Sequence, residues 1–287
     1  MIEYIRTPLI RTEKIFLKPE NLQPLGSYKI RGVSSAIRTA PLKTLSNGVS
    51  AASAGNLAQS LALAARSLKI PCTIYAPITA PDTKKDAIRR LGAELVELPF
   101  TQVWEYVRKP PETPGLFVHP VFTPGLLEGY GTIVDELLKD RPTLDAIVVP
   151  YGVGGLTLGI ARRIKQLKPT ISVYACEPET AAPLKTSLTN GKATAIERKP
   201  SFVDAIGTPE VIEGVFEEVQ HLIEDSIVVS LPEIRQSLRQ LALQHKLICE
   251  GAGAAAFAAA MKLTRHNEIA CILTGGNIAP ETLREIV

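Results

Sequence analysis

Short apolar segments alternate with longer segments of helical period along most of this chain. In the first half, the expected strand and helix pairs are 48–52 with 56–68, 71–75 with 82–91, and 93–98 with 101–108. In the second half, a strand at 144–150 precedes a helix at 156–167, and further strands are expected at 171–176 and 268–273. This alternation is typical of a mainly parallel sheet with helices on both faces, so the pattern predicts an α/β fold.

Composition and charge narrow the classes of function. The 287 residues are 45% apolar, which is enough for a sizeable core, and the net charge of +3 comes from interspersed acidic and basic residues. Such a surface does not favour nucleic acid or membrane as a partner. The first residues lack the pattern of a signal peptide, and the longest apolar run, around 251–263, is too short to span a bilayer. We therefore expect a cytoplasmic protein.

The cysteines and histidines indicate no metal site. The sequence contains no CxxC pair, and no histidine lies at a spacing that is typical of metal ligands. The cysteines lie in apolar segments, where reduced core positions are expected, at Cys72, Cys176, Cys249 and Cys271.

The stretch Gly26–Gly32, GSYKIRG, places a lysine in the first turn of an expected helix. With Ser27 as the N-cap, Lys29 lies among backbone N–H groups that have no helical partner. The helix dipole disfavours an ammonium there, which lowers the pKa of Lys29 and leaves more of the nucleophilic amine, as a Schiff-base lysine requires. Gly32 would be explained by a group that packs closely against it. An ordinary surface lysine is the alternative, and by itself this stretch favours that alternative.

The loop Pro150–Gly155, PYGVGG, follows an expected strand and opens an expected helix. Its glycines let the backbone approach a phosphate and offer several N–H groups to it. A rival interpretation uses the same loop, because Gly152-x-Gly154 with Glu177 resembles a dinucleotide-binding pattern in which an acid holds a ribose. That pattern is incomplete, since its third glycine is replaced by Thr157.

Two further loops follow expected strands. The stretch Ser53–Asn56, SAGN, precedes a helix, so an anion could bind at the helix start beside the side chains of Ser53 and Asn56. The stretch Thr274–Asn277, TGGN, supplies a hydroxyl at a strand end, where open α/β sheets bind ligands. Each loop alone could be an ordinary turn, but together the four supply an amine, two anion sites and a hydroxyl.

In combination, these loops resemble those of the fold type II pyridoxal-phosphate enzymes, in the branch of threonine/serine dehydratases (ammonia-lyases) and serine racemases. The matching stretches occur in the family's order over nearly the whole chain, at 18–32, 53–56, 129–132, 152–155, 250–254 and 274–277. The resemblance implies a two-domain, tryptophan synthase β-like fold, with a large domain of residues 1–46 and 130–287 and a small domain of residues 47–129. It also implies pyridoxal 5'-phosphate as the cofactor, and we expect a homodimer.

Carried over residue by residue, the resemblance assigns Lys29 to the Schiff base with the cofactor and to transfer of the substrate's Cα proton. Asn56 would contact the cofactor's ring hydroxyl, and Thr274 would face its pyridine nitrogen. The backbone N–H groups that would hold the cofactor phosphate are those of Gly152, Val153, Gly154, Gly155 and Leu156. The substrate carboxylate would bind at Ser53, Ala54, Gly55, Asn56 and Leu57. The implied reaction is loss of water from a β-hydroxy amino acid such as threonine or serine, giving a 2-oxo acid and ammonia.

Several positions depart from the family's pattern. Leu57 replaces the usual histidine, which alters the carboxylate pocket, and Tyr130 stands where glutamine is usual. Ala54 replaces the serine that racemases use as a second base, so racemisation is disfavoured as the main activity. Pro183 stands where a racemase-type metal site after Glu177 would need an aspartate, so we expect no such divalent metal site.

Three other functions stay open at this point. Enzymes of β-replacement, similar to cysteine synthase, usually carry Lys-Asp-Arg, whereas this chain has Lys29-Ile-Arg31. A nicotinamide-dependent dehydrogenase built on the glycine loop and Glu177 would leave the other loops unexplained. A non-catalytic binding protein on the same fold is disfavoured by the intact Lys29. Because the chain ends ten residues after Asn277, we expect no C-terminal regulatory domain.

Overall fold

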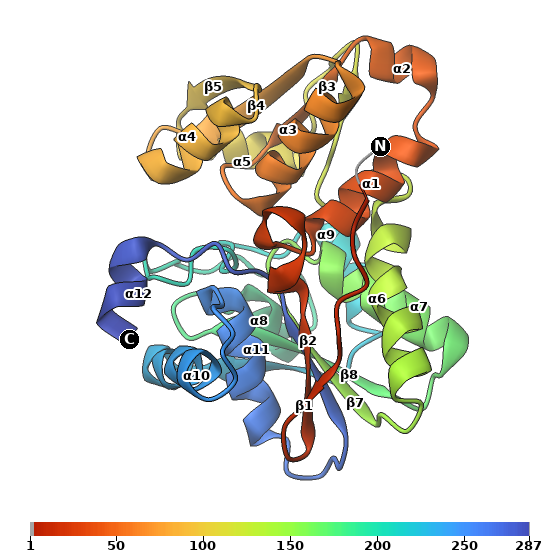
Figure 1. The fold of residues 1–287 in the computed structure, drawn as a ribbon, viewed down its shortest axis with the longest axis vertical. Coiled ribbons are helices and arrows are strands. Elements are labelled where there is room, and N and C mark those ends of the chain that lie inside the picture. The colour runs from red at the N-terminus through yellow and green to blue at the C-terminus, as the bar shows by residue number, and fades with distance from the viewer. Residues whose placement is uncertain (1–2, 287) are drawn as a thin grey trace. The chain divides into compact units, whose positions relative to one another are not determined.

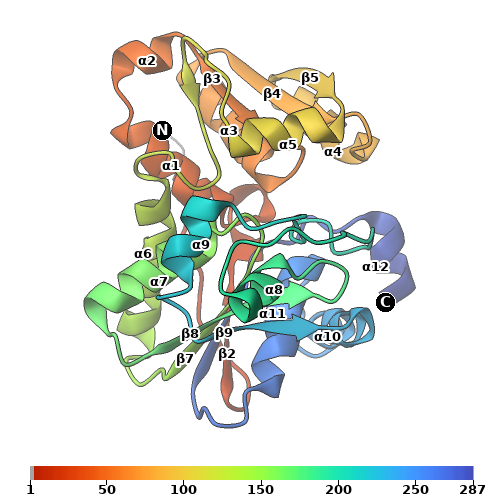
Figure 2. The same cartoon turned by 180° about the vertical axis from the view of Figure 1, so that it is seen from behind.

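The computed structural model describes residues 3–286. Helices and strands alternate along the chain, and the strands form two separate sheets (Figures 1 and 2). The expected elements begin and end within about two residues of the positions that the apolar pattern predicts. The α/β class is therefore confirmed. The described chain divides into two compact units, one of residues 3–5 and 29–130 and the other of residues 6–28 and 131–286.

The first unit is built on a four-stranded parallel sheet with the order β5-β4-β3-β6. Its strands are β3 (Val49–Ala52), β4 (Cys72–Pro77), β5 (Glu94–Leu98) and β6 (Leu116–Phe117). Its helices are α1 (Lys29–Thr39), α2 (Leu42–Ser46), α3 (Asn56–Leu68), α4 (Asp82–Arg90) and α5 (Phe100–Arg108). Helices α3 and α5 cover opposite faces of this sheet (Figures 1 and 2).

The second unit is built on a six-stranded sheet with the order β1-β2-β10-β7-β8-β9. Only the pair of β1 and β2 is antiparallel within it. Its strands are β1 (Ile10–Arg11), β2 (Ile15–Pro19), β7 (Ala146–Pro150), β8 (Ser172–Pro178), β9 (Asp225–Val229) and β10 (Ile269–Leu273). The α6 helix (Leu126–Asp140) begins in the first unit and continues into the second.

The remaining helices of the second unit surround this sheet. They are η1 (Glu20–Leu22), η2 (Pro24–Gly26), α7 (Gly155–Leu167), α8 (Pro183–Asn190), α9 (Glu213–Val219), α10 (Leu231–Leu243), α11 (Gly251–Lys262) and α12 (Pro280–Ile286). Helices α10 and α11 lie on one side of the sheet and α7 on the other (Figures 1 and 2).

The core of the second unit lies between the sheet and α11. Strands β2, β7 and β10 are buried along their whole length, as expected for a parallel sheet covered on both faces. The α11 helix consists almost entirely of glycine and alanine, whose small side chains let it pack closely on the strands. The apolar run noted in the sequence is therefore a core helix. Among helices in the described part of the chain, none has the length and apolarity needed to cross a membrane.

Strand β2 is not predicted by the apolar pattern because Lys18 interrupts it. The Lys18 ammonium is nevertheless buried, and it donates hydrogen bonds to the carbonyl oxygen of Thr7 (2.7 Å) and to Glu136 Oε2 (2.5 Å). A buried charge is tolerated when it is paired and hydrogen-bonded in this way. Tertiary contacts thus permit a strand where local hydrophobicity gives a weak signal.

The adjacent parallel strands β2, β10 and β7 end at the same edge of the six-stranded sheet. Their carboxyl ends lead into Glu20, Thr274 and Tyr151, respectively. Open α/β sheets bind ligands beyond the carboxyl ends of their strands. This edge therefore brings the Thr274–Asn277 loop and the Pro150–Gly155 loop to neighbouring strands.

The domain boundaries expected from the sequence assign residues 29–46 to the larger domain. In the structure these residues group with the first unit because α1 packs along α3. The division into a small domain of residues 47–129 and a large domain stays a prediction.

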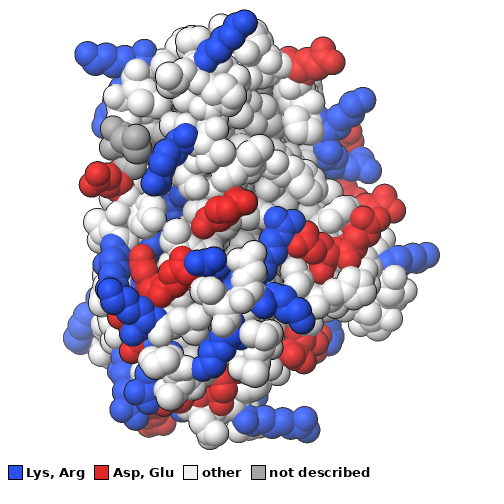
Figure 3. All heavy atoms as spheres, turned by 90° about the vertical axis from the view of Figure 1, so that its right-hand side faces the viewer, with Lys and Arg blue, Asp and Glu red and all other residues white. Residues whose placement is uncertain are grey.

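Charged side chains are mixed on the molecular surface. On the face drawn in Figure 3, Lys and Arg side chains lie next to Asp and Glu side chains. This agrees with the interspersed charges of the sequence.

Candidate active site

Helix α1 begins at Lys29, one residue later than a cap at Ser27 would give. The backbone before the lysine is paired with the loop after β10. Ser27 forms an antiparallel bridge with Gly275, and the Tyr28 N–H donates a hydrogen bond to the Thr274 carbonyl oxygen (3.1 Å). The lysine that the sequence predicts to be reactive thus follows directly on a segment bonded to the Thr274–Asn277 loop.

The turn before Lys29 is held by the end of the same loop. Leu25 has φ of 59°, a left-handed conformation that costs energy for a residue with a side chain. The Asn277 amide donates a hydrogen bond from Nδ2 to the Leu25 carbonyl oxygen (2.9 Å), and the Gly276 N–H donates one to Gly26 (2.9 Å). Asn277, whose role could not be predicted from the TGGN motif alone, therefore stabilises this turn.

Thr274 lies beside the carboxyl group of Glu250, whose role was not predicted from the sequence. Both Thr274 and Glu250 are buried, and the threonine hydroxyl donates a long hydrogen bond to Glu250 Oε1 (3.4 Å). A Cβ on Gly275 would lie 2.7 Å from the same carboxylate oxygen, which explains the glycine after Thr274. An acidic residue directly before a Gly-Ala helix start is the sequence signal that could have identified Glu250.

The Pro150–Gly155 loop has the local geometry of an anion-binding helix start. Gly154 has φ of 103°, and a Cβ there would lie 2.5 Å from Val215 Cγ1, so this position needs glycine. Helix α7 then begins at Gly155 without a side-chain cap and without an acidic residue in its first turn. Within residues 3–286, no group accepts a hydrogen bond from the N–H groups of residues 152–156. These donors can therefore bind an anion.

Tyr151 adds a second polar group to this loop. It is only 1% exposed, and its hydroxyl has no hydrogen-bond partner within the described residues. The hydroxyl oxygen would lie 3.3 Å from a Cβ on Gly154, so it packs directly against the loop. Burial raises the pKa of Tyr151 well above its ordinary value, so the phenol stays protonated. A buried hydroxyl of this kind can hydrogen-bond to a polar ligand.

The Ser53–Asn56 loop follows β3 and opens α3 in the first unit. Ser53 Oγ accepts a hydrogen bond from the Gly55 N–H (3.1 Å), and the helix start has neither a side-chain cap nor an acidic residue. A Cβ on Gly55 would meet no atom within 4 Å, so the loop is open on this side. Leu57 is buried, so its side chain is directed into the protein.

The Glu177 carboxylate is hydrogen-bonded to other groups of the protein. It is fully buried, and its two carboxylate oxygens accept hydrogen bonds from the N–H groups of Leu184 and Lys185 (both 2.8 Å) and from Ser226 Oγ (2.6 Å). Burial raises the pKa of Glu177 to about 7. A carboxylate that holds the start of α8 is not available to a ribose, so the dinucleotide interpretation loses its acidic residue.

The described residues contain no cluster of three or more His, Cys, Asp or Glu side chains that could hold a metal ion. The four cysteines are all buried and free, as expected for core positions.

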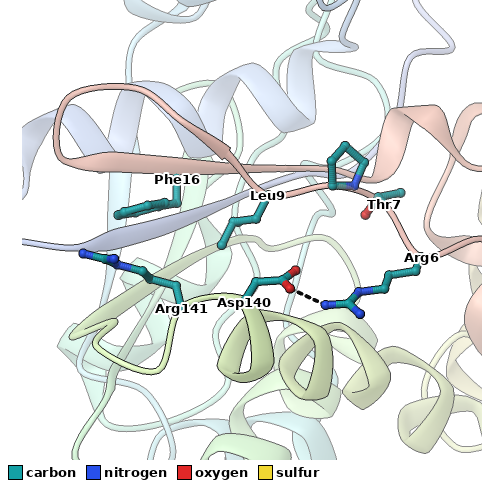
Figure 4. Close-up of a pocket in the computed structure, with 7 residues that line it drawn as sticks. Arg6, Thr7, Leu9, Phe16, Asp140 and Arg141 are labelled. Atoms are coloured by element: carbon teal, nitrogen blue, oxygen red, sulfur yellow. Dashed lines mark hydrogen bonds and ion pairs between the residues drawn. The ribbon is translucent and has the colours of Figure 1, made fainter.

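A pocket of about 570 Å³ lies elsewhere in the second unit (Figure 4). It is lined by Arg6, Thr7, Pro8, Leu9, Phe16, Asp140 and Arg141. Arg6 pairs with Asp140 and Arg141 pairs with Glu268, so carboxylates balance both guanidinium charges. None of the site residues expected from the sequence lines this pocket.

The predicted site residues are distributed over both units. Lys29 and the Ser53–Leu57 segment belong to the first unit, whereas residues 152–156 and Thr274 belong to the second. The structure brings Thr274 and the 152–156 loop to neighbouring strands, and it bonds the Thr274 loop to the residue before Lys29.

Comparison with known proteins matches residues 2–275 to the family described as pyridoxal-phosphate dependent enzyme. The chain belongs to this family. It is 37% identical over 279 residues to L-threonine ammonia-lyase of Thermotoga maritima, covering 96% of this chain and 70% of that relative. The family and its pyridoxal-phosphate dependence, both expected from the sequence, are confirmed.

Solved structures agree with this assignment. The fold matches maize serine racemase with a TM-score of 0.89 and 29% identity, covering 98% of this chain and 91% of that structure. It matches threonine deaminase isoform 2 of Solanum lycopersicum with a TM-score of 0.88 and 29% identity, covering 99% and 88%. The fold type II architecture expected from the sequence is confirmed.

The residues of the pyridoxal-phosphate enzyme fit its cofactor. The N–H groups of residues 152–156 and the buried Tyr151 hydroxyl are donors suited to a phosphate, and Lys29 supplies an amine. Thr274 supplies a hydroxyl at the adjacent strand end. The donors of the second unit therefore suit a phosphate and a polar group next to it.

Proposed function

We propose that this enzyme eliminates water from a β-hydroxy amino acid of the threonine or serine type, giving a 2-oxo acid and ammonia. The observation that carries the proposal is the pairing of the segment before Lys29 with the Thr274 loop. The 37% identity to L-threonine ammonia-lyase of Thermotoga maritima supports the same reaction class.

The open N–H groups of the glycine loop and the resemblance to the family together support a set of cofactor-binding residues. The N–H groups of Gly152, Val153, Gly154, Gly155 and Leu156 would hold the phosphate. Asn56 would contact the ring hydroxyl and Thr274 the ring nitrogen, while the Lys29 amine would attach the cofactor covalently. The chemistry that pyridoxal phosphate supplies when bound is electron withdrawal from the substrate's Cα.

Lys29 performs the proton transfers in this proposal. Its amine, freed when the substrate binds, accepts the proton from Cα and becomes an ammonium. The ammonium then returns a proton to the β-hydroxyl as the C–O bond breaks, so the hydroxyl leaves as water. The released enamine hydrolyses to the 2-oxo acid and ammonia. One lysine thus serves as base and acid in turn.

The two remaining loops orient the substrate and limit the reaction type. The open helix start at Ser53, Ala54, Gly55, Asn56 and Leu57 would bind the substrate carboxylate. Thr274 offers the ring nitrogen a neutral hydroxyl, which supports less electron withdrawal than a carboxylate would. This fits elimination better than transamination.

We also infer that the protein is a cytoplasmic homodimer and that residues 47–129 act as the small domain. Sedimentation equilibrium over a tenfold range of concentration tests the dimer. A species with the mass of a single chain throughout that range would contradict it.

A substrate panel tests the proposed reaction. Threonine, serine, 3-hydroxyaspartate and phenylserine are each incubated with the holoenzyme without thiol, and 2-oxo acid and ammonia are measured. Equal amounts of both products from at least one of them are expected. Inverted amino acid without 2-oxo acid would instead indicate racemisation, which Ala54 disfavours, and product only after thiol is added would indicate β-replacement.

Lys29→Ala is the decisive variant. We expect it to lose turnover, because it lacks the group that moves the proton, while its circular dichroism spectrum remains that of the wild type. In the wild-type holoenzyme, borohydride reduction followed by mass spectrometry is expected to place the cofactor on Lys29. A label on another lysine, or full activity of Lys29→Ala, would overturn the assignment.

A further inference from the structure

Tyr130 is a fully buried aromatic residue in the part of α6 that belongs to the first unit. Its ring occupies the space where a side chain at Gly32 would lie, since a Cβ there would be 2.6 Å from Tyr130 Cζ. Glycine inside a helix is destabilising relative to alanine, so its presence at position 32 needs a reason. The tyrosine ring is the closely packed group that this glycine accommodates.

Gly129, the residue before Tyr130, lets α6 approach α1 closely at the same place. A Cβ on Gly129 would lie 2.8 Å from the Gly32 Cα, so α6 and α1 approach each other backbone to backbone. The close approach determines where the Tyr130 ring can lie. It therefore restricts the ring to the face of α1 that carries Gly32.

Lys29 lies on that same face, because residues three apart on a helix are neighbours. Its Nζ is 5.7 Å from the centroid of the Tyr130 ring. This distance is within the range of about 6 Å over which an ammonium is attracted to an aromatic face. The Tyr130 ring therefore has two contacts on this face: it fills the space beside Gly32, and it lies near the Lys29 amine.

Arg31, the other basic residue of this turn, contacts residues near the N-terminus. The Arg31 guanidinium lies 4.7 Å from the Tyr4 ring centroid and donates a hydrogen bond to the Ile5 carbonyl oxygen (3.2 Å). Burial raises the pKa of the Tyr130 phenol far above its ordinary value, so the phenol does not exchange its proton with the lysine. The contribution of Tyr130 is therefore the face of its ring.

We propose that Tyr130 is a positioning residue that stabilises the ammonium form of Lys29 and directs its Nζ, which rests on the proton-transfer role proposed for this lysine. The ring stabilises the ammonium that forms when the amine accepts the Cα proton, and it holds Nζ against the face of α1 that carries Gly32. The family usually has glutamine at this position, so an aromatic ring beside the lysine is a feature of this chain.

Tyr130→Leu removes the aromatic face, and Tyr130→Phe keeps it as the matched control. For Tyr130→Leu we expect kcat to fall about tenfold with KM changed less than about twofold, because the ammonium formed by abstraction of the Cα proton loses its aromatic support. Tyr130→Phe is expected to retain kcat within about twofold.

A second measurement separates this role from a structural one. Attachment of pyridoxal phosphate to the cofactor-free protein requires the neutral amine of Lys29, so its rate constant in Tyr130→Leu should equal or exceed that of the wild type. A merely structural defect would lower both the attachment rate and kcat. A fall in both, or an unchanged kcat, would overturn the proposal. If Tyr130→Leu does not fold, Tyr130→Met fills the site without an aromatic face and is measured in its place.

The Gly32 contact supplies an independent test. Gly32→Ala should displace the ring and lower kcat by a factor similar to that of Tyr130→Leu. In the Tyr130→Leu background, where Cε1 and Cζ are absent, the same substitution should have little further effect. Equal losses in both backgrounds would contradict the proposal. If the cofactor attaches but no substrate gives a 2-oxo acid, the proposed function is wrong. The attachment rates of wild type and Tyr130→Leu would still test whether the ring acts on Lys29.

Discussion

Glu177 is buried completely, and the fold uses both of its carboxylate oxygens. The hydrogen bonds from Leu184, Lys185 and Ser226 place it at the start of α8. In the sequence it can be interpreted as a ribose-binding acid or as part of a racemase-type metal site. In the folded protein each of its oxygens accepts a hydrogen bond from the protein, so Glu177 has a structural role at the start of α8.

The buried carboxyl group predicts a pH dependence of stability. Its pKa is raised by burial from 4.5 to about 7, so between these values the folded protein binds more protons than the unfolded chain. The free energy of unfolding should therefore fall as pH rises through this window, by up to about 1.4 kcal/mol per pH unit from this residue. Urea unfolding of the wild type and of Glu177→Gln measures the difference. Parallel pH profiles of the two proteins would show that Glu177 does not titrate there.

The helix starts of this protein differ in how their first N–H groups are satisfied. Helix α10 begins with a capping box, in which Ser230 accepts a hydrogen bond from the Glu233 N–H and the Glu233 carboxylate accepts one from the Ser230 N–H. Helices α3 and α7 begin without any side-chain cap. Because the first N–H groups of a helix require acceptors, a start without a side-chain cap or an acidic residue in its first turn, such as that of α3 or α7, can bind an anion.

Gly154→Ala is expected to weaken cofactor binding by about tenfold or more. The substitution places a methyl group 2.5 Å from Val215 Cγ1 and forces a left-handed residue, costing about 1–2 kcal/mol for the conformation alone. The resulting shift of the loop would move the N–H groups of residues 152–156. Titration of the cofactor-free protein with pyridoxal phosphate measures the affinity.

Gly191→Ala is the matched control for this substitution. Gly191 also has a positive φ, of 67°, but a Cβ there would meet no atom within 4 Å, and the residue follows α8 rather than α7. It should lose a similar conformational energy while the cofactor affinity stays that of the wild type. Equal affinities for both variants would mean that the Gly154 loop does not hold the phosphate.

On the scale of the whole molecule, the folded state should be stabilised by its cofactor through mass action. A ligand present at 100 times its Kd, and bound only by the folded protein, adds about 2.7 kcal/mol to the free energy of unfolding. The thermal unfolding midpoint should rise with pyridoxal phosphate concentration and rise less in Lys29→Ala, which lacks the covalent attachment. Pyridoxal without its phosphate is the control and should have a smaller effect. A midpoint independent of pyridoxal phosphate would contradict the assigned cofactor site.

The sequence by itself determined the α/β class, the approximate bounds of elements such as α3, and the family with its cofactor. These properties are encoded locally, because a helical period, an apolar strand or a glycine-rich turn is complete within a short stretch of chain. The loops around Lys29, Gly154 and Thr274 could be identified for the same reason. Their order along the chain indicated pyridoxal phosphate without knowledge of the strand order.

Only the tertiary structure decided how distant residues are paired. It placed β10 between β2 and β7, buried Lys18 against Glu136, and set the Tyr130 ring against Gly32. It also assigned Asn277 to the Leu25 turn. Each of these depends on contacts between residues far apart in sequence, and local periodicity carries no information about them. The roles of individual polar side chains therefore became definite only when the packing that satisfies or excludes them was known.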